Sequence, residues 1–236
     1  MIFVGTCGFP KSREQIFSTM NAVELQETFY DMPDFKKINR LKSEAPPNFK
    51  LSVKVFQGIT HHPGSPTMKK AIHFHSDEST GGLKPTSQNL ELWNSFIKET
   101  AVLAPALYVF QTPPSYGSEE QLRDAYEFFK NIKSDAKIGW EPRGKAYENS
   151  GMVVRIFDDL GIVHIVDPLR RSPISRGLQY FRLHGKGNRE TNYSYNYTDK
   201  DLYELYLKVR DFSEAFIMFN NINMFENAKV FMEKFL

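Results

Sequence analysis

Residues 179–185, QYFRLHG, alternate polar and apolar side chains in a way that decides the fold class. Side chains of a strand point alternately to its two faces, so Tyr180, Arg182 and His184 share one face and Phe181 and Leu183 the other. The apolar pair suits a face covered by helices. Buried charge is costly unless it meets partners, so the polar face is expected to point into a barrel, where strand ends assemble functional sites.

Seven other short apolar runs have the length and the β-branched or aromatic content of strands. The eight predicted strands cover residues 2–5, 22–26, 50–55, 106–111, 137–141, 163–167, 179–184 and 215–220. Helical patterns lie between most of them, at 12–20, 34–43, 88–103, 118–132, 148–160, 199–212 and 224–235. Strands that alternate with helices favour parallel pairing and right-handed crossovers.

Eight such units in 236 residues predict an α/β fold, a single parallel eight-stranded (β/α)8 TIM-like barrel over residues 1–236. An open doubly wound sheet is the alternative, but GTCGFPK after the first strand matches its glycine-rich turn poorly. Residues 57–87, rich in Gly, Pro, Ser and His, predict a long excursion after strand three. Residues 168–178, PLRRSPISRGL, predict no regular helix between strands six and seven.

Composition excludes several classes of protein. The formal charge of +2, from 30 basic and 28 acidic residues, argues against a protein that coats nucleic acid. The single cysteine, Cys7, forms no intramolecular disulfide and suggests a reducing compartment. The first residues lack a basic leader, and no run reaches the roughly 20 apolar residues of a membrane helix. We therefore expect a cytoplasmic protein with no membrane partner.

Nearly every predicted strand ends in a group that ionises or forms hydrogen bonds. These groups are Glu24 and Gln26, Lys54, Gln111, Glu141 with Arg143, Asp167, Arg182 with His184, and Asn220 with Asn221. For any one of them, an ordinary salt bridge that closes the top of the barrel is the simpler interpretation. Seven strand ends that agree favour a functional pocket at the C-terminal mouth.

Six blocks of sequence carry a family resemblance. In order, VELQETFYDMP (23–33), ITH (59–61), FQTPPS (110–115), WEPR (140–143), FRLHG (181–185) and FNN (219–221) resemble the YecE-like proteins, domain-of-unknown-function family 72. The resemblance implies a barrel with no assigned activity and a suggested distant kinship with divalent-metal sugar isomerases. Its implied mouth residues are Glu24, Thr28, Tyr30, Lys54, His61, Gln111, Glu141, Arg143, Asp167, Arg182, His184, Asn220 and Asn221.

The sequence departs from the family at three points. Cys7 stands where the family usually has Ser, Gln26 stands where it usually has Asn, and the glycine usual after FNN is absent. No motif here requires an ionised thiol, so Cys7 is interpreted as a small buried residue rather than a nucleophile.

The main functional hypothesis is a hydrolase, lyase or isomerase that acts on an anionic or phosphorylated small molecule. Glu141 would be the general base and His184 the general acid, with Asp167 and Glu24 as further acids or bases. Positive charge for the substrate comes from Lys54, Arg143 and Arg182, and Gly185-Lys186-Gly187 follows strand seven, near where many barrels hold phosphate. The remaining predicted substrate-binding residues are Gln111, Tyr30, His61, Asn220 and Asn221.

Two alternatives stay open. No cofactor is expected, but Glu141, Asp167 and His184 could hold Mg²⁺ or Mn²⁺, although the arginines are poor neighbours for a cation. Nucleic-acid binding or repair would use aromatic rings near basic groups, namely Phe29, Tyr30 and the tyrosines of TNYSYNYT (191–198) beside Arg189. The near-neutral charge favours a mobile polar loop or an aromatic lid for that segment. The substrate, the reaction and the oligomeric state are not determined by the sequence.

Overall fold

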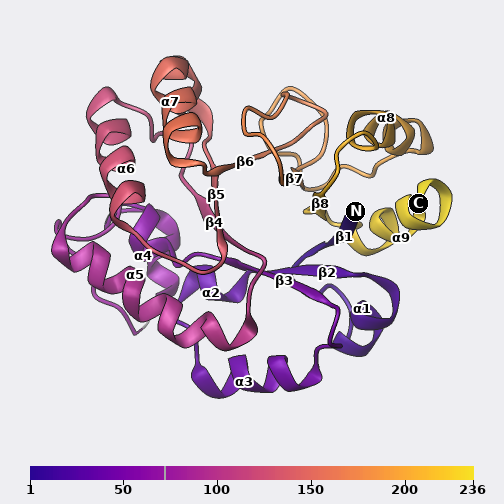
Figure 1. Cartoon of the computed structure of the whole chain (residues 1–236), viewed down its shortest axis with the longest axis horizontal. Helices are drawn as coiled ribbons and strands as arrows, with labels where there is room; N and C mark the ends of the chain where they lie inside the picture. The colour runs from indigo at the N-terminus through magenta and orange to yellow at the C-terminus, as the bar shows by residue number, and fades with distance from the viewer. Residues whose placement is uncertain (72) are drawn as a thin grey trace. The chain divides into compact units, whose positions relative to one another are not determined.

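In the computed structural model, which describes residues 1–71 and 73–236, eight strands follow one another in chain order around a closed barrel (Figure 1). The strands are β1 (Ile2–Cys7), β2 (Ala22–Leu25), β3 (Lys50–Lys54), β4 (Leu107–Gln111), β5 (Lys137–Glu141), β6 (Val163–Val166), β7 (Gln179–Leu183) and β8 (Ala215–Phe219). Neighbouring strands pair in parallel. The predicted (β/α)8 class is confirmed.

Helices connect most of these strands. They are α1 (Arg13–Thr19), α2 (Glu27–Tyr30), α3 (Phe35–Glu44), α4 (Gln57–Thr60), η1 (Pro66–Lys70), α5 (Ser87–Thr100), η2 (Ala101–Leu103), α6 (Glu119–Asn131), η3 (Gly144–Asn149), α7 (Ser150–Leu160), α8 (Asp199–Val209) and α9 (Met224–Phe235). The short helices α2, α4 and η1 are absent from the sequence prediction, because one helical turn is too short to show a 3.6-residue period. Between β6 and β7 there is no helix, as predicted.

Side-chain caps begin the longer helices where the sequence predicts them. Ser118 and Gln121 form a reciprocal capping box at α6, and Thr198 and Asp201 do the same at α8. The Ser12 hydroxyl accepts a hydrogen bond from the Gln15 backbone at α1. Each cap satisfies amide groups that have no partner within the helix, and so fixes where the helix starts.

The chain divides into two compact units. The first unit comprises Met1–Leu25, Ala45–Ser52 and Val163–Leu236, and the second comprises Gln26–Glu44 and Val53–Ile162. The expectation of one domain over residues 1–236 stays a prediction. In the part of the chain that the structure describes, no helix has both the length and the apolar character needed to cross a membrane.

The core of the first unit lies where β1, β7 and β8 meet. The rings of Phe3 and Phe216 stack with centroids 4.7 Å apart, and Tyr180 stacks on Phe216 at 5.5 Å. Helix α9 packs on β1 and β8 and lies beside α8, at the yellow end of the chain in Figure 1. These contacts hold the carboxyl ends of β7 and β8 in a fixed register, with Leu183 opposite Phe219.

The core of the second unit is an aromatic cluster on β4 and β5. Phe110 packs against Trp93 of α5 and Phe129 of α6, in both cases with ring centroids 5.2 Å apart. Trp140 lies 5.8 Å from Phe129, and both tryptophans are fully buried. The cluster anchors the strands that end in Gln111 and Glu141, which face each other in register.

Gly5 generates a stability prediction, because an added Cβ would lie 2.0 Å from the carbonyl oxygen of Ala22 on the neighbouring strand. We expect Gly5→Ala to lower the free energy of unfolding by about 1–3 kcal/mol or more, through overpacking. Gly151→Ala in α7, where an added Cβ meets open space, is the control and should leave stability unchanged or raise it by up to about 1 kcal/mol. Urea denaturation measures both, and an unaltered Gly5→Ala variant would contradict this close approach of β1 and β2.

Candidate functional site

A buried ion pair crosses the interior of the first unit. Arg182 Nη2 on β7 lies 2.9 Å from Glu24 Oε1 on β2, and both side chains are fully buried. Strands β8 and β1 separate β7 from β2 in the sheet, so the contact runs across the barrel interior. The Tyr180 hydroxyl donates to the other oxygen of Glu24 at 2.9 Å. Tyr180 and Arg182 therefore share the inward face that the alternation predicts.

Two further observations describe the surroundings of this pair. Burial raises the pKa of Tyr180 well above its ordinary value, and the charge of Glu24 adds to the effect, so the hydroxyl remains a donor. Arg182 Nη2 also donates to Cys7 Sγ at 3.7 Å, and Cys7 is a buried free thiol in register with Glu24. Cys7 is thus a packed side chain next to the pair, as the sequence indicates.

Asp167, His184 and Asn220 form a hydrogen-bonded group where β6, β7 and β8 end. Asp167 Oδ2 accepts from the His184 backbone N–H at 3.2 Å, and Asp167 Oδ1 accepts from Leu169 at 3.0 Å. Asn220 Nδ2 lies 3.1 Å from His184 Nδ1. An amide nitrogen only donates, so Nδ1 is the acceptor and the ring proton lies on Nε2. Asp167 thus fixes the backbone of His184, and Asn220 fixes its ring.

The segment after His184 is folded onto α8 by its own side chains. Gly185 donates its N–H to the Tyr197 hydroxyl at 2.7 Å. Gly185 has φ +81, and an added Cβ would lie 2.1 Å from the Asn192 carbonyl oxygen. Lys186 Nζ pairs with Asp201 at 2.7 Å and with Glu204 at 2.8 Å. Lys186 is engaged by these carboxylates, so the Gly185-Lys186-Gly187 turn serves to attach the loop to α8.

In the second unit, Glu141 and Arg143 form a second buried pair. Both Nε and Nη2 of Arg143 lie 2.6 Å from Glu141 Oε1. The Glu141 backbone oxygen accepts from Thr112, whose hydroxyl in turn accepts from the Trp140 indole at 3.2 Å. The aromatic core thereby connects directly to the end of β5. This arrangement orients both charged groups at the strand end.

A neutral histidine lies among cations in the same unit. Lys54 Nζ lies 4.0 Å from the centroid of Phe29, and the His61 ring contacts the edge of Phe29 with centroids 5.2 Å apart. The Thr60 hydroxyl lies 2.8 Å from His61 Nδ1. Burial lowers the pKa of His61 to about 3, and the positive charges of Lys54 and Arg143 contribute to that lowering. His61 is therefore neutral at physiological pH.

The predicted site residues fall into groups within each unit. The structure brings together Glu24 with Arg182, Asp167 and His184 with Asn220, Glu141 with Arg143, and Lys54 with His61. Asn221 turns elsewhere and donates to the Tyr195 carbonyl and to Asn227 Oδ1, both at 2.8 Å. Tyr30, 37% exposed, lies under Lys70 Nζ, which is 4.6 Å from its ring centroid.

Two residues of these groups are not among the predicted site residues. The alternation places Tyr180 on the polar face of Arg182, and that face is the signal that could have assigned it to the site. Asn227 on α9 contacts Asn221 only through long-range folding and has no sequence signal of its own. Tyr193, which the sequence analysis names for base stacking, contacts the edge of the His184 ring.

The described residues contain no group of three or more His, Cys, Asp or Glu side chains arranged to hold a metal ion. Asp167 and His184 belong to the first unit and Glu141 belongs to the second. The metal ligand set suggested by the sequence therefore stays a prediction.

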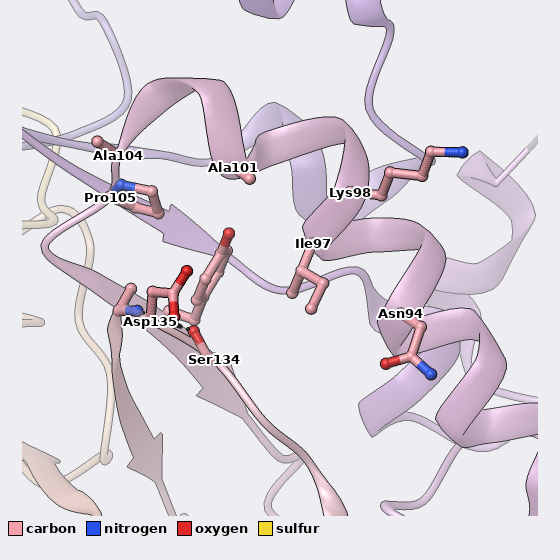
Figure 2. A pocket seen from close by; sticks show the side chains of 10 residues that line it. Asn94, Ile97, Lys98, Ala101, Ala104, Pro105, Ser134 and Asp135 are labelled. Carbon is pink, nitrogen blue, oxygen red and sulfur yellow. Dashed lines mark hydrogen bonds between the residues drawn. The ribbon is translucent and has the colours of Figure 1, made fainter.

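Of two cavities in the structure, one is lined by predicted site residues and the other is not. One, of about 360 Å³ in the first unit, is lined by Tyr193, Ser194, Asn220, Asn221, Ile222 and Met224. The other, of about 490 Å³ in the second unit, lies between α5 and the segments that lead into β4 and β5 (Figure 2). Lys98 and Asp135 line this second cavity, together with small side chains such as Ala101 and Ala104. No predicted site residue lines it, and it adjoins the amino ends of the strands rather than the carboxyl ends, where barrel enzymes carry their sites.

The Glu24–Arg182 pair generates a stability prediction. Glu24→Gln removes one charge and leaves Arg182 buried without its carboxylate, so we expect the free energy of unfolding to fall by about 3–5 kcal/mol. Glu119→Gln is the control, because it breaks an exposed ion pair with Arg123 and should cost less than about 1 kcal/mol. Urea unfolding compares the two, and equal losses would argue against the buried pair as a structural constraint.

His61 generates a pH prediction. The unfolded histidine takes a proton near its ordinary pKa of 6.5, whereas the folded one does so only near 3. The stability of the folded state is therefore fully present above pH 6.5 and falls as the pH decreases toward 3, by up to about 1.4 kcal/mol per pH unit. Urea unfolding at pH 7.5, 6 and 5 should show a steeper loss for the wild type than for His61→Gln. Parallel profiles would contradict a neutral, buried His61.

Solved structures show the same fold. A crystal structure of a DUF72 family protein (EF0366) from Enterococcus faecalis V583 at 3.10 Å matches with TM-score 0.75 and 18% identity, over 100% of this chain and 95% of that one. A 2.52 Å structure of the same protein gives TM-score 0.73 and 21% identity, over 99% and 96%. The crystal structure of SacUVDE gives TM-score 0.55 and 12% identity, over 98% and 96%.

The family itself is identified by sequence. No curated protein matches the chain. The family model described as "Protein of unknown function DUF72" matches residues 13–235, nearly the whole chain, in agreement with the six ordered blocks. The chain therefore belongs to the DUF72 family.

Proposed function

We propose that the protein is an enzyme, a hydrolase, lyase or isomerase, that acts on an anionic or phosphorylated small molecule. The observation that carries the proposal is His184 at the meeting of three consecutive strand ends: Asp167 accepts a hydrogen bond from its backbone N–H, and Asn220 Nδ2 lies 3.1 Å from its ring Nδ1. Barrel enzymes assemble their sites from such ends. A histidine fixed at such a strand end is a common acid–base group.

The proposed roles in the first unit follow from hydrogen bonding. With Nδ1 as acceptor of the Asn220 amide, the His184 ring carries its proton on Nε2, so we assign it the donation of a hydrogen bond to a substrate oxygen. Asp167 holds the His184 backbone and is the carboxylate that can accept a proton. Glu24 and Arg182 are fully buried and pair with each other, so we assign them a supporting role without direct substrate contact.

The proposed roles in the second unit concern negative charge. Lys54 and the Arg143–Glu141 pair lie near the neutral His61, and cationic side chains in this place suit a phosphate or a carboxylate. Glu141, held by Arg143, is the proposed general base, and Gln111 beside it in register offers an amide. Alanine at Glu141 should abolish turnover, and the melting temperature of the variant verifies that it is still folded. Retained turnover would remove Glu141 from that role.

Nucleic-acid binding is the second candidate function, and one observation favours it. The Tyr193 ring is 48% exposed and contacts the edge of the His184 ring, with centroids 5.9 Å apart. Tyr195 and Tyr197 are less available for base stacking, because their hydroxyls bind Asp201 and the Gly185 N–H. A strand of nucleic acid would therefore rely on Tyr193 among these three tyrosines.

A thermal-shift screen of sugar phosphates, inorganic phosphate and small dicarboxylates tests the proposal, with and without Mg²⁺ or Mn²⁺. A ligand that binds the folded state raises Tm as its concentration increases. We expect at least one anionic compound to do so, and Arg143→Met to weaken its affinity about 10- to 100-fold. His73→Gln, at an exposed position, is the control and should leave affinity unchanged. A Tm that no anion raises would end the proposal, and a shift seen only with divalent metal would favour the metal-dependent alternative.

A further inference from the structure

The cavity of about 360 Å³ in the first unit is connected to the imidazole of His184 through its walls. Two of its lining residues touch that ring. Tyr193 packs its edge on His184 at an interplanar angle of 83°, and Asn220 donates to His184 Nδ1 at 3.1 Å. A group held in the cavity would therefore lie next to the proposed reacting imidazole.

Hydrogen bonds between two loops preform this cavity. The Ile222 backbone N–H donates to the Tyr193 carbonyl at 2.7 Å, and Asn221 Nδ2 donates to the Tyr195 carbonyl at 2.8 Å. Asn192 N–H donates to the His184 carbonyl at 2.7 Å. The loop after β7 is thus joined to the turn after β8. Sites for small ligands are typically preformed concavities of roughly 300–1,000 Å³, and this cavity lies in that range.

The walls combine exposed apolar surface with amides. Ile222 is 72% exposed, Tyr193 is 48% exposed, and Met224 completes the apolar part of the lining. Large apolar side chains exposed together around a hollow commonly mark a binding surface. Asn220, Asn221 and Ser194 contribute the polar part. Such a lining suits a flat ring with apolar faces and a polar edge better than it suits an alkyl chain or a compact ion.

Asn221 supplies an independent observation that points to a ligand. The residue is only 2% exposed, and its Oδ1 accepts no hydrogen bond from any residue that the structure describes. Its Nδ2 is already used by Tyr195 and Asn227. A buried acceptor without a donor is unfavourable. A rotation of the Asn221 amide toward the cavity would let an N–H group of a bound ring satisfy it.

We propose that this cavity holds the heterocyclic base of a nucleotide, with the ring on Tyr193 and Ile222 and an N–H at its edge on Asn221. The inference rests on the proposed function and specifies it, because the anionic substrate then becomes a nucleotide unit. Base stacking on an aromatic side chain tolerates any base, so the cavity recognises the class rather than one member. A free nucleotide and a nucleotide within a single strand offer the same chemistry.

Calorimetric titration of the whole chain with four kinds of probe separates the contribution of the base to binding from that of the phosphate. Ribose 5-phosphate tests the anion alone, the four common ribonucleosides test the base alone, and the corresponding 5′-monophosphates test both. A short single-stranded oligonucleotide distinguishes a strand from the free nucleotide. We expect at least one monophosphate to bind about 5- to 100-fold more tightly than ribose 5-phosphate.

Three variants test whether the tighter binding of the monophosphate, relative to ribose 5-phosphate, comes from the cavity. Tyr193→Ala should remove the advantage of the monophosphate over ribose 5-phosphate, and Tyr193→Phe should retain it because the ring remains. Tyr203→Ala removes a comparably exposed tyrosine from α8 in the same unit and should leave nucleotide affinity unchanged. The melting temperature of each variant verifies that it is folded.

The outcomes keep the inference and the proposed function apart. Monophosphates that bind no better than ribose 5-phosphate would overturn the inference and leave the proposed function intact. Nucleosides that bind through Tyr193 while ribose 5-phosphate does not would support the inference and count against the anion-based proposal. A tightly bound oligonucleotide with Tyr193-dependent affinity would support the base site and assign its nucleotide to a strand. Binding of none of the four probes would overturn the inference.

Discussion

The charge pair between Glu24 and Arg182 is the constraint on which the rest of the first unit depends. Two charges removed from water lose their hydration, and only close, well-directed partners compensate for that loss. Tyr180 and Cys7 add hydrogen bonds around the pair. The result ties β2 to β7 across the interior, because movement of either side chain would break the 2.9 Å contact between the two charges. Buried apolar residues could fill the same volume at similar or greater stability, so packing alone does not account for the pair.

A reason for the pair appears at the next inward position of β7. His184 follows Arg182 by two residues, so fixing one side chain orients the strand end that carries the other. Asp167 then holds the His184 backbone, and Asn220 holds its ring. Each partner comes from a different strand end. The buried Glu24–Arg182 pair fixes the strand, and the hydrogen bonds of Asp167 and Asn220 fix the residue that follows it. Together they define the position of the His184 imidazole within the parallel barrel.

The sequence predicts what depends on short-range pattern and leaves out what depends on distant contacts. The alternation in 179–184 predicts the inward face of β7, and Ser118 and Thr198 mark the starts of α6 and α8. The ionisation of His61 is different, because it follows from burial and from the approach of Lys54. The sequence places Lys54 at a strand end and His61 in the ITH block, but it shows neither the burial of His61 nor the distance between the two side chains. Tyr193 likewise gains meaning only when folding sets it against the His184 ring.

The chemistry open to the His184 ring depends on which kind of side chain faces its Nδ1 atom. A carboxylate at Nδ1 would favour a doubly protonated ring, as in a base that gains a proton during reaction. Asn220 donates to Nδ1 instead, and a nitrogen that accepts this bond cannot also carry a proton. The neutral ring with Nε2–H is thereby favoured, and such a ring is suited to polarise an oxygen by hydrogen bonding. In the proposed function, proton abstraction is therefore the role of a carboxylate, and in the first unit that carboxylate is Asp167 rather than the imidazole.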